Sequence, residues 1–527
     1  MRRLALLLAL ALAACSGGGD PGPAGDVTLQ VLSNRADLVS DGNAYMEVVV
    51  PPGSMADDLK VDVDGTDVTS AFARRPNGRI LGVVTGLKVG ANTVTARLAG
   101  VNKGARLVVT NTARGGPIFS GPQLQPWICA TKAGSAVHVT VPGTSLAASV
   151  PTAVNGLDSD PVDAQCNTPT KYDHYYKPAS KAPTCTVGIT GTDPCFVPYD
   201  PAARPADALI ADFTNDRGDR VKALVRLESG VIDRGSYVIL SYFDPAQASS
   251  PWSPQKGWNG KLLYRFGAAA SGNRFQYRAE LGGLAGPDWI WDHNALARGF
   301  MVAAGSLTNH LDNNNEVLAA EQMMMIKEHI IDTYGEIRYT MGEGASGGSM
   351  MQTGIASVMP GLLQGLLTGV SYPDAISTWI ETRDCALAAE FYKTSAGSAF
   401  TADQRTAIEG HPSTHCPTWV ASFLLSQKPT VATNCAGLGA LIPNGLAFPA
   451  SLVYDPVLRP QGVRCSIHDV MGNIFGTVME SGRVVPKLPY DNVGVQYGLK
   501  ALASGAITPE QFVRLNEAIG AYDTDLN

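Results

Sequence analysis

The order of apolar and polar residues changes in character along the chain, beginning with a strand-rich N-terminal stretch. Between residues 27 and 111, short runs of β-branched and alternating residues recur between turn signals, among them VTLQVLS, AYMEVVV and NTVTARLAG. Period-two alternation at this spacing predicts the strands of a β-sandwich. We therefore expect an immunoglobulin-like β-sandwich over residues 26–112 that serves as a spacer or adhesion module.

A different pattern follows the sandwich. Residues 122–205 are rich in loops, and then strand-like runs such as SYVILSYF, KLLYRFG, FMVAAG and GLLTGVSY alternate with helical runs such as AAEQMMMIKEHIIDTYG. Alternation of strands and helices predicts a doubly wound, mostly parallel α/β sheet, which we place at residues 113–374. Helical segments dominate residues 375–527. They predict a lid or insertion in which the last two helices pack, and these helices are not expected to close the sheet.

The first residues indicate export. Arg2 and Arg3 precede an apolar run that is too short to span a bilayer, and the run ends in LAAC. The pattern resembles a bacterial lipobox, which predicts a signal peptide over 1–14, lipidation of Cys15 and a flexible tether over 15–25. An ordinary secretory signal with a chance cysteine is the alternative. No later run is apolar for long enough to span a membrane, so we expect a cell-envelope protein anchored only by the Cys15 lipid.

Composition narrows the class of protein. The 527 residues are 45% hydrophobic and 17% charged, with a net charge of −7, so a basic nucleic-acid-binding surface is not expected. Eight cysteines follow Cys15 in two groups of four. In an oxidising compartment they predict two disulfides in each half of the chain. No CxxC pair occurs, and we expect no metal site.

The string Gly344-Ala-Ser-Gly-Gly348 carries the candidate chemistry. It matches G-x-S-x-G, in which a serine on a sharp strand-to-helix turn projects its hydroxyl from the edge of a sheet. An apolar strand before it and an amphipathic helix after it favour Ser346 as a nucleophile. The overlapping string from Gly342 to Gly347 also reads as a dinucleotide fingerprint, but the next acid, Asp374, lies farther on than the ~20 residues that this motif needs. We expect no cofactor.

An oxyanion hole needs two backbone N–H groups. The N–H of Gly347, directly after the serine, is one candidate. The small-residue loop that starts at Gly267, after the strand KLLYRFG, is the other. A plain tight loop is the alternative interpretation of that segment.

Several segments together resemble the tannase and feruloyl esterase family: WNGKLLYRFG, GFMVAAGSLTNH, KEHIIDTYGE and GEGASGGSMMQTGIASVMPGLLQGLLTGVSYPD. GPIFSGPQLQPWIC, RPQGVRCSIHD and DNVGVQYGLKAL make the chain even more similar to related secreted bacterial hydrolase-like proteins. The resemblance implies an α/β-hydrolase fold and hydrolysis of a small-molecule or polymeric ester through an acyl-enzyme on Ser346. One departure is that Ala345 and Gly347 flank the serine, where tannase-type enzymes often have a cysteine.

The sequence indicates the catalytic acid and base that would act with Ser346 less clearly. In this fold the acid and then the histidine follow the serine, and three histidines do so: His411, His415 and His468. His468 is the candidate base, with a structural lid histidine as the alternative. Asp374 is the candidate acid, with a helix cap as the alternative. His310, after the strand FMVAAG, is a candidate substrate-side residue or a loop residue.

In the resembled families the acid and histidine lie beyond the lid. We therefore expect a C-terminally incomplete or degenerate hydrolase, in which no histidine reaches the hydroxyl of Ser346. The alternative function is a non-catalytic, surface-anchored binding protein that keeps the hydrolase framework.

Overall fold

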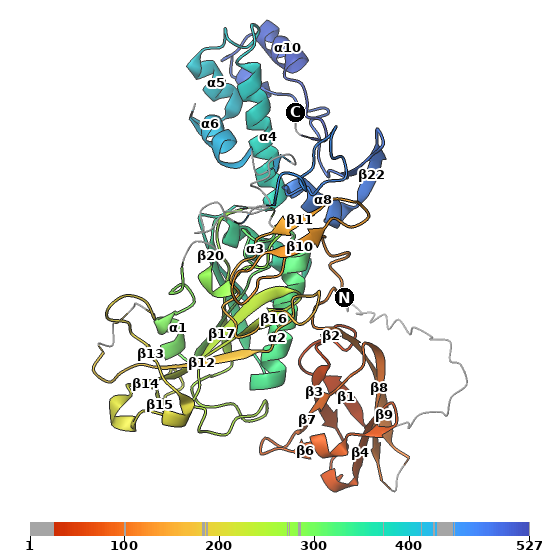
Figure 1. The fold of residues 1–527 in the computed structure, drawn as a ribbon, viewed down its shortest axis with the longest axis vertical. Helices are drawn as coiled ribbons and strands as arrows, with labels where there is room; N and C mark the ends of the chain where they lie inside the picture. Colours follow the sequence, from red (N-terminus) through yellow and green to blue (C-terminus); the bar gives the residue numbers. More distant parts are fainter. Residues whose placement is uncertain are drawn as a thin grey trace, which may run out of the picture.

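The computed structural model of the chain describes residues 26–525, except 100–101, 182–184, 186–187, 271, 273, 283–285, 373, 413, 425–426, 429–445 and 447, and except the side chain of His468. Figure 1 shows the N-terminal sheets at one end, a large sheet in the middle and a group of helices at the other end. The predicted signal peptide, the lipidation site Cys15 and the tether lie outside the described residues.

The first nine strands form two sheets that pack face to face, as the alternating pattern predicts. One sheet has the order β1 (Thr28–Val31), β3 (Asn43–Val49), β7 (Ile80–Thr85), β6 (Ala73–Arg74). The other has the order β2 (Val39–Ser40), β9 (Gly104–Thr112), β8 (Gly90–Leu98), β4 (Leu59–Val63), β5 (Thr66–Asp67). Alternate residues of both sheets, such as Met46 and Val94, share one buried apolar core.

The large central sheet has eight strands. Their order is β13 (Val197–Pro198), β12 (Lys171–Tyr176), β16 (Leu224–Ile232), β17 (Gly235–Tyr242), β19 (Phe300–Gly305), β18 (Lys261–Arg265), β20 (Tyr339–Ala345), β21 (Gly365–Gly369). Strands β19, β18, β20 and β21 run parallel, and the pairings from β13 to β19 are antiparallel. The prediction of a mostly parallel sheet is therefore wrong for its first half.

A tight hairpin explains this difference. Strands β16 and β17 are joined by Asp233 and Arg234, whose φ angles are 54° and 52°. Two successive residues with positive φ make the kind of two-residue turn that fits the twist of antiparallel strands. A parallel pairing would need a longer crossover connection.

Both faces of the central sheet are covered. Leu262 and Met301 face the helices α2 (Glu316–Tyr334) and α3 (Gly347–Val358). The alternate residues Leu263 and Val302 face α1 (His293–Ala297) and the loops around it. Because both faces are buried, these strands consist almost entirely of apolar residues.

Helix α2 also joins the central sheet to the N-terminal sandwich. Glu328, on α2, accepts hydrogen bonds from the backbone N–H of Ser40 (2.8 Å), the hydroxyl of Ser40 (2.9 Å) and the amide of Asn34 (3.0 Å). One turn further, Asp332 accepts from the N–H of Tyr45 at 2.7 Å. Burial raises the pKa of Glu328 to about 8 and that of Asp332 to about 6.

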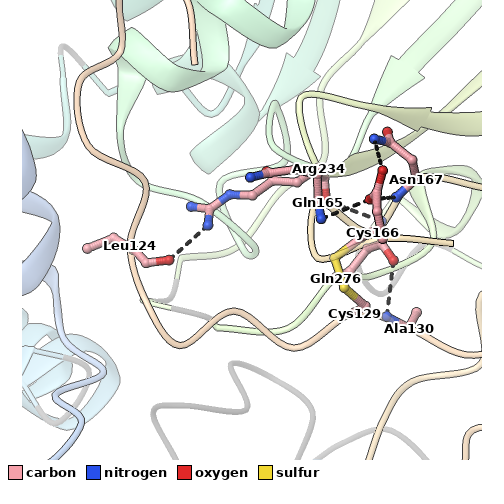
Figure 2. Close-up of a disulfide and its surroundings, with 9 residues drawn as sticks. Leu124, Cys129, Ala130, Gln165, Cys166, Asn167, Arg234 and Gln276 are labelled. Carbon is pink, nitrogen blue, oxygen red and sulfur yellow. Dashed lines mark hydrogen bonds between the residues drawn. A yellow bond between two sulfur atoms is a disulfide. The ribbon is translucent and has the colours of Figure 1, made fainter. Parts of the chain in front are cut away.

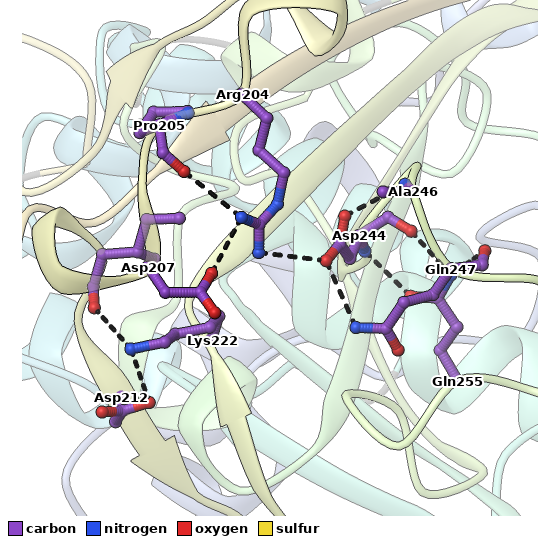
Figure 3. Close-up of polar contacts among 10 residues, drawn as sticks. Arg204, Pro205, Asp207, Asp212, Lys222, Asp244, Ala246, Gln247 and Gln255 are labelled. Carbon is purple, nitrogen blue, oxygen red and sulfur yellow. Dashed lines mark hydrogen bonds and ion pairs between the residues drawn. The ribbon is translucent and has the colours of Figure 1, made fainter.

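The segment expected to consist of loops contributes ordered structure to one edge of the central sheet. Strand β12 pairs with β16 over six residues and places Tyr175 against Trp291. Two hairpins of this half are β10 (Val137–Thr140) with β11 (Ala147–Val150), and β14 (Asp212–Thr214) with β15 (Arg220–Lys222). In Figure 3, Arg204 bridges Asp207 (2.8 Å) and Asp244 (3.2 Å), so this edge is tied to the residues after β17.

Disulfides hold these loops. Figure 2 shows the Cys129–Cys166 bond close to Arg234, which donates to the carbonyl oxygen of Leu124 at 2.8 Å. Two further disulfides are Cys185–Cys195 and Cys385–Cys416. Cys465 is disulfide-bonded as well, and its partner is not among the described residues. The prediction of disulfides in both halves is confirmed, and such bonds are typical of exported proteins.

The C-terminal region is mainly helical, as predicted, and it contains α4 (Ala375–Phe391), α5 (Ala402–Glu409), α6 (His415–Trp419), α8 (Ile467–Phe475), α9 (Leu499–Ala503) and α10 (Pro509–Ala518). A hairpin, β22 (Thr477–Glu480) with β23 (Arg483–Pro486), was not foreseen. The last two helices pack on α4 and α5 through Leu515 and Phe391. Among the described helices none is long and apolar enough to cross a membrane.

Candidate functional site

Ser346 lies at the sharp turn between β20 and α3. Its φ of 55° and ψ of −118° fall outside the backbone regions that non-glycine residues favour. Such a backbone conformation costs about 1–3 kcal/mol. The turn is fixed from both sides, because the N–H of Ser346 donates to the carbonyl oxygen of Gly369 at 2.9 Å and its own carbonyl accepts from Ser349 at 2.9 Å. The G-x-S-x-G motif predicts this strained turn.

The glycines around the serine are required by close packing against the loop after β18. A Cβ on Gly344 would lie 2.7 Å from the carbonyl oxygen of Phe266, and one on Gly348 would lie 2.6 Å from the same atom. A Cβ on Gly347 would lie 2.0 Å from the carbonyl oxygen of Ala269. The strand-to-helix turn and residues 266–269 therefore approach each other to a distance that only glycine permits.

The groups needed for chemistry at the turn are available. Ser346 is half-buried, and its hydroxyl makes no hydrogen bond within the described part of the chain. The N–H of Gly347, in the first turn of α3, also has no acceptor there. Gly267, the other oxyanion candidate, begins the loop that contacts this turn, and it packs on the side chain of Asn309. Its part in an oxyanion hole stays a prediction.

His310 lies beside this turn. Its Cβ would be 2.7 Å from a Cβ placed on Gly347, and its ring stacks on Trp379 of α4 at a centroid distance of 6.5 Å. Nδ1 lies 3.1 Å from the carbonyl oxygen of Ala269, whereas Nε2 is buried and has no hydrogen-bond partner among the described residues. Burial lowers the pKa of His310 to about 4, so the imidazole is neutral at physiological pH.

Helix α8 brings the segment of His468 to the same place. Ile467 packs in one apolar cluster with Met350, which follows Ser346 by one helical turn. A Cβ on Gly272, in the loop after β18, would lie 3.0 Å from the carbonyl carbon of Ser466. The start of α8 therefore lies against the loop after β18 and shares an apolar cluster with the helix that follows Ser346. The side chain of His468 is outside the described residues, so its role as base stays a prediction.

Asp374, the candidate acid, caps helix α4. Its carboxylate accepts from the N–H of Ser377 at 2.7 Å and from the hydroxyl of Ser377 at 2.8 Å. The capping alternative is therefore present in the structure, and a catalytic role stays a prediction. A buried carboxyl that the sequence analysis did not consider lies nearby: burial raises the pKa of Glu316 to about 7.

An open groove of about 940 Å³ runs along the carboxyl ends of β18, β20 and β21. Its wall includes Ala345, the residue before the nucleophile candidate, and the indole of Trp289. Arg265 lies 5.2 Å from the centre of that indole and pairs with Glu343 at 3.1 Å. The groove thus combines an aromatic face with a guanidinium beside the strained turn.

A sequence match assigns the chain to a family. Residues 29–527 match the "Tannase-like family of unknown function (DUF6351)". The chain belongs to this family. The tannase-like resemblance inferred from the motifs is thereby confirmed, although the family description specifies no activity. No curated protein matches the sequence significantly.

The solved structures that resemble this tannase-like chain do so only weakly. Oligopeptidase B from Trypanosoma brucei is 13% identical with a TM-score of 0.20, over 68% of this chain and 56% of that chain. The Leishmania major enzyme is 12% identical with a TM-score of 0.19, over 67% and 49%. The N-terminal eight Ig domains of Down Syndrome Cell Adhesion Molecule are 14% identical with a TM-score of 0.15, over 41% and 24%. The chain spans about a quarter to a little over half of these structures.

Proposed function

We propose that this protein is a serine-dependent carboxylic-ester hydrolase with Ser346 as nucleophile. The observation that carries the proposal is the strained turn at Ser346, where, among the described residues, neither the serine hydroxyl nor the adjacent N–H of Gly347 has a hydrogen-bond partner. Backbone strain at a single non-glycine residue is a feature of functional sites. We further propose an α/β-hydrolase core and an immunoglobulin-like N-terminal sandwich, supported by the parallel strands that flank the turn and by the two packed sheets.

In the proposed reaction Ser346 attacks the ester carbonyl, and the negative charge that develops on the carbonyl oxygen is held by the N–H of Gly347 and by an N–H of the loop that begins at Gly267. The proposed base is His468. Support comes from the position of its helix, because Ile467 shares one buried apolar cluster with Met350, one helical turn after Ser346. A base must come within ~3 Å of the hydroxyl or reach it through one water.

Aromatic esters are the first substrates to test. Trp289 lines the groove next to the turn, and a flat aromatic acyl or leaving group would stack on its indole. Arg265 and its partner Glu343 line the same groove and offer hydrogen-bonding groups to a phenolic hydroxyl. The name of the tannase-like family points to the same chemical class.

A fluorophosphonate probe tests the nucleophile without knowledge of the substrate, because it reacts only with activated serines. We expect labelling of wild type at Ser346 and loss of both labelling and p-nitrophenyl ester hydrolysis in Ser346→Ala. Ser371, an exposed serine just after β21, supplies the matched control. Ser371→Ala should label and hydrolyse like wild type. Equal activity in wild type and Ser346→Ala would refute the assignment.

The second candidate is a non-catalytic, surface-anchored binding protein. One observation favours it: the carboxylate of Asp374, the candidate acid, is occupied as a helix cap by the N–H and hydroxyl of Ser377. On this proposal wild type and Ser346→Ala are equally unreactive toward the probe. Saturable binding of an aromatic ester, weakened by Trp289→Ala, would then support it.

A further inference from the structure

Three potential metal ligands converge in the C-terminal helical region. Nε2 of His415 lies 2.7 Å from Oε1 of Glu381, and Nε2 of His411 lies 3.8 Å from the same oxygen. The three ligand atoms all lie within 4.8 Å of one another. Glu381 belongs to α4, whereas His411 precedes α6 and His415 is its first residue, so the cluster depends on the tertiary fold.

A covalent bond holds the two segments in register. Cys385 follows Glu381 by one turn of α4, and Cys416 directly follows His415. The Cys385–Cys416 disulfide therefore joins the helix to the histidine segment next to the cluster, with a Cα–Cα distance of 4.8 Å. The N–H of His415 also donates to the carbonyl oxygen of Pro412 at 2.8 Å, which closes the turn between the histidines. The ligands are thus positioned without a bound ion.

Ordinary hydrogen bonding accounts for only part of this arrangement. His415 is within hydrogen-bond distance of Glu381, but at 3.8 Å Nε2 of His411 is too far, and His411 has no other hydrogen bond to the described residues. The two imidazoles stack with centroids 4.1 Å apart and an angle of 24° between their planes. Stacking brings both Nε2 atoms to the same carboxylate oxygen, an arrangement that a shared cation explains.

The donor set identifies the class of ion. Two imidazole nitrogens and one carboxylate suit Zn²⁺, which takes four ligands in a tetrahedron at about 2.0–2.2 Å, so neighbouring ligand atoms lie about 3.4 Å apart. The distances of 2.7 and 3.8 Å bracket that value. Ca²⁺ and Mg²⁺ prefer sites made of oxygen ligands. The side chains of Glu381 and His411 are 41% and 51% exposed, so a fourth position is open to water.

We propose that Glu381, His411 and His415 bind a divalent transition-metal ion of the Zn²⁺ class, with water as the fourth ligand. The site borders a cavity of about 700 Å³ between α4 and residues 495–500, and the water position is open to solvent on that side. Bound metal links the histidine segment to α4 a second time, beside the disulfide. The site is separate from Ser346, and the proposal does not depend on the esterase assignment.

Isothermal titration of the full chain with ZnCl₂, after chelator treatment and dialysis, tests the proposal. We expect binding of a single ion, and a loss of affinity of at least ~100-fold in His411→Gln and in His415→Gln, because even the loss of an outer-sphere partner costs ~10–100-fold. His138, exposed on β10, gives the matched control. His138→Gln should bind Zn²⁺ like wild type. Circular dichroism verifies that each variant is folded.

Co²⁺ provides an independent measurement. A tetrahedral site gives intense visible absorption, which should appear in wild type and His138→Gln and be lost in the double variant His411→Gln/His415→Gln. The proposal is overturned if the double variant binds Zn²⁺ as tightly as wild type. Binding as weak as that of an isolated surface histidine overturns it, and so does preference for Ca²⁺ over Zn²⁺. Ser346→Ala should retain full Zn²⁺ binding, which separates this outcome from that of the esterase test.

Discussion

Replacing Gly347 by alanine tests the contact between the strand-to-helix turn and the loop after β18. The added Cβ would lie 2.0 Å from the carbonyl oxygen of Ala269 and 2.7 Å from Cβ of His310. Close carbon–oxygen contacts in proteins settle at ~3.3–3.6 Å. The carbonyl of Ala269 must therefore retreat by more than about 1 Å. Because this atom belongs to the backbone, the whole loop has to move with it.

Two consequences of known size follow from that movement. Overpacking of a closely packed site costs about 1–3 kcal/mol of folding free energy. A displacement of about 1 Å in catalytic geometry can cost ~100-fold in rate. We therefore expect Gly347→Ala to lower the urea midpoint and to reduce fluorophosphonate labelling of Ser346 about 100-fold, with the fold otherwise intact by circular dichroism.

Gly354→Ala is the matched control in the same helix. Its Cβ would lie 2.5 Å from the carboxyl carbon and 2.7 Å from Cγ of Glu316, so a side chain has to shift and the backbone of the loop after β18 does not. Alanine also raises helix propensity by about 1 kcal/mol, so stability should change by less than about 1 kcal/mol and labelling should remain. If Gly347→Ala matched wild type in both measurements, the loop after β18 would not lie against the turn as described.

Three further predictions concern other parts of the chain. Burial raises the pKa of Glu328 to about 8 and that of Asp332 to about 6. Their contribution to the free energy of unfolding is therefore complete below pH ~4 and is lost as the pH rises through 6 for Asp332 and through 8 for Glu328. Glu328→Gln should remove the part of this loss that occurs between pH ~6 and ~9 in urea titrations. Asp374→Ala should cost about 1 kcal/mol as a lost cap, while Asp374→Asn keeps the cap, so loss of esterase activity in the asparagine variant alone would identify a catalytic acid. Cys15→Ser should release the protein from the membrane fraction, and unchanged fractionation would refute the lipid anchor.

Local patterns predicted the elements around the candidate nucleophile well. FMVAAG coincides with β19, and the strand–serine–helix order of GEGASGG appears as β20, the turn at Ser346 and α3. These predictions succeed because burial on both faces of a parallel sheet forces near-continuous apolar runs, and because a serine at positive φ needs small neighbours. Both requirements are visible within a few residues of sequence.

Contacts between distant segments were not predictable in this way. Lys171–Tyr176 lies among prolines and cysteines, and its assignment to β12 depends on pairing with β16 about fifty residues later. Glu381 and His411 are brought together by a disulfide whose connectivity the sequence does not specify. The His-x-x-x-His spacing of residues 411 and 415 is the one local signal for the candidate metal site, and the absence of CxxC pairs says nothing about a site made of histidine and glutamate.

Helix α2 has consequences for how the sequence can vary. One of its sides supports the central sheet, and Glu328 on another side receives the sandwich, so even Glu321 and Gln322 are fully buried. Glu321 accepts from Ser120, and Gln322 bonds the carbonyl oxygen of Ile232. A substitution that looks like an ordinary surface exchange on a polar helix position would therefore leave a buried partner unpaired. Amino-acid substitutions in this helix are constrained by the central sheet and by the sandwich at the same time. A substitution that suits one of them must also be compatible with the other.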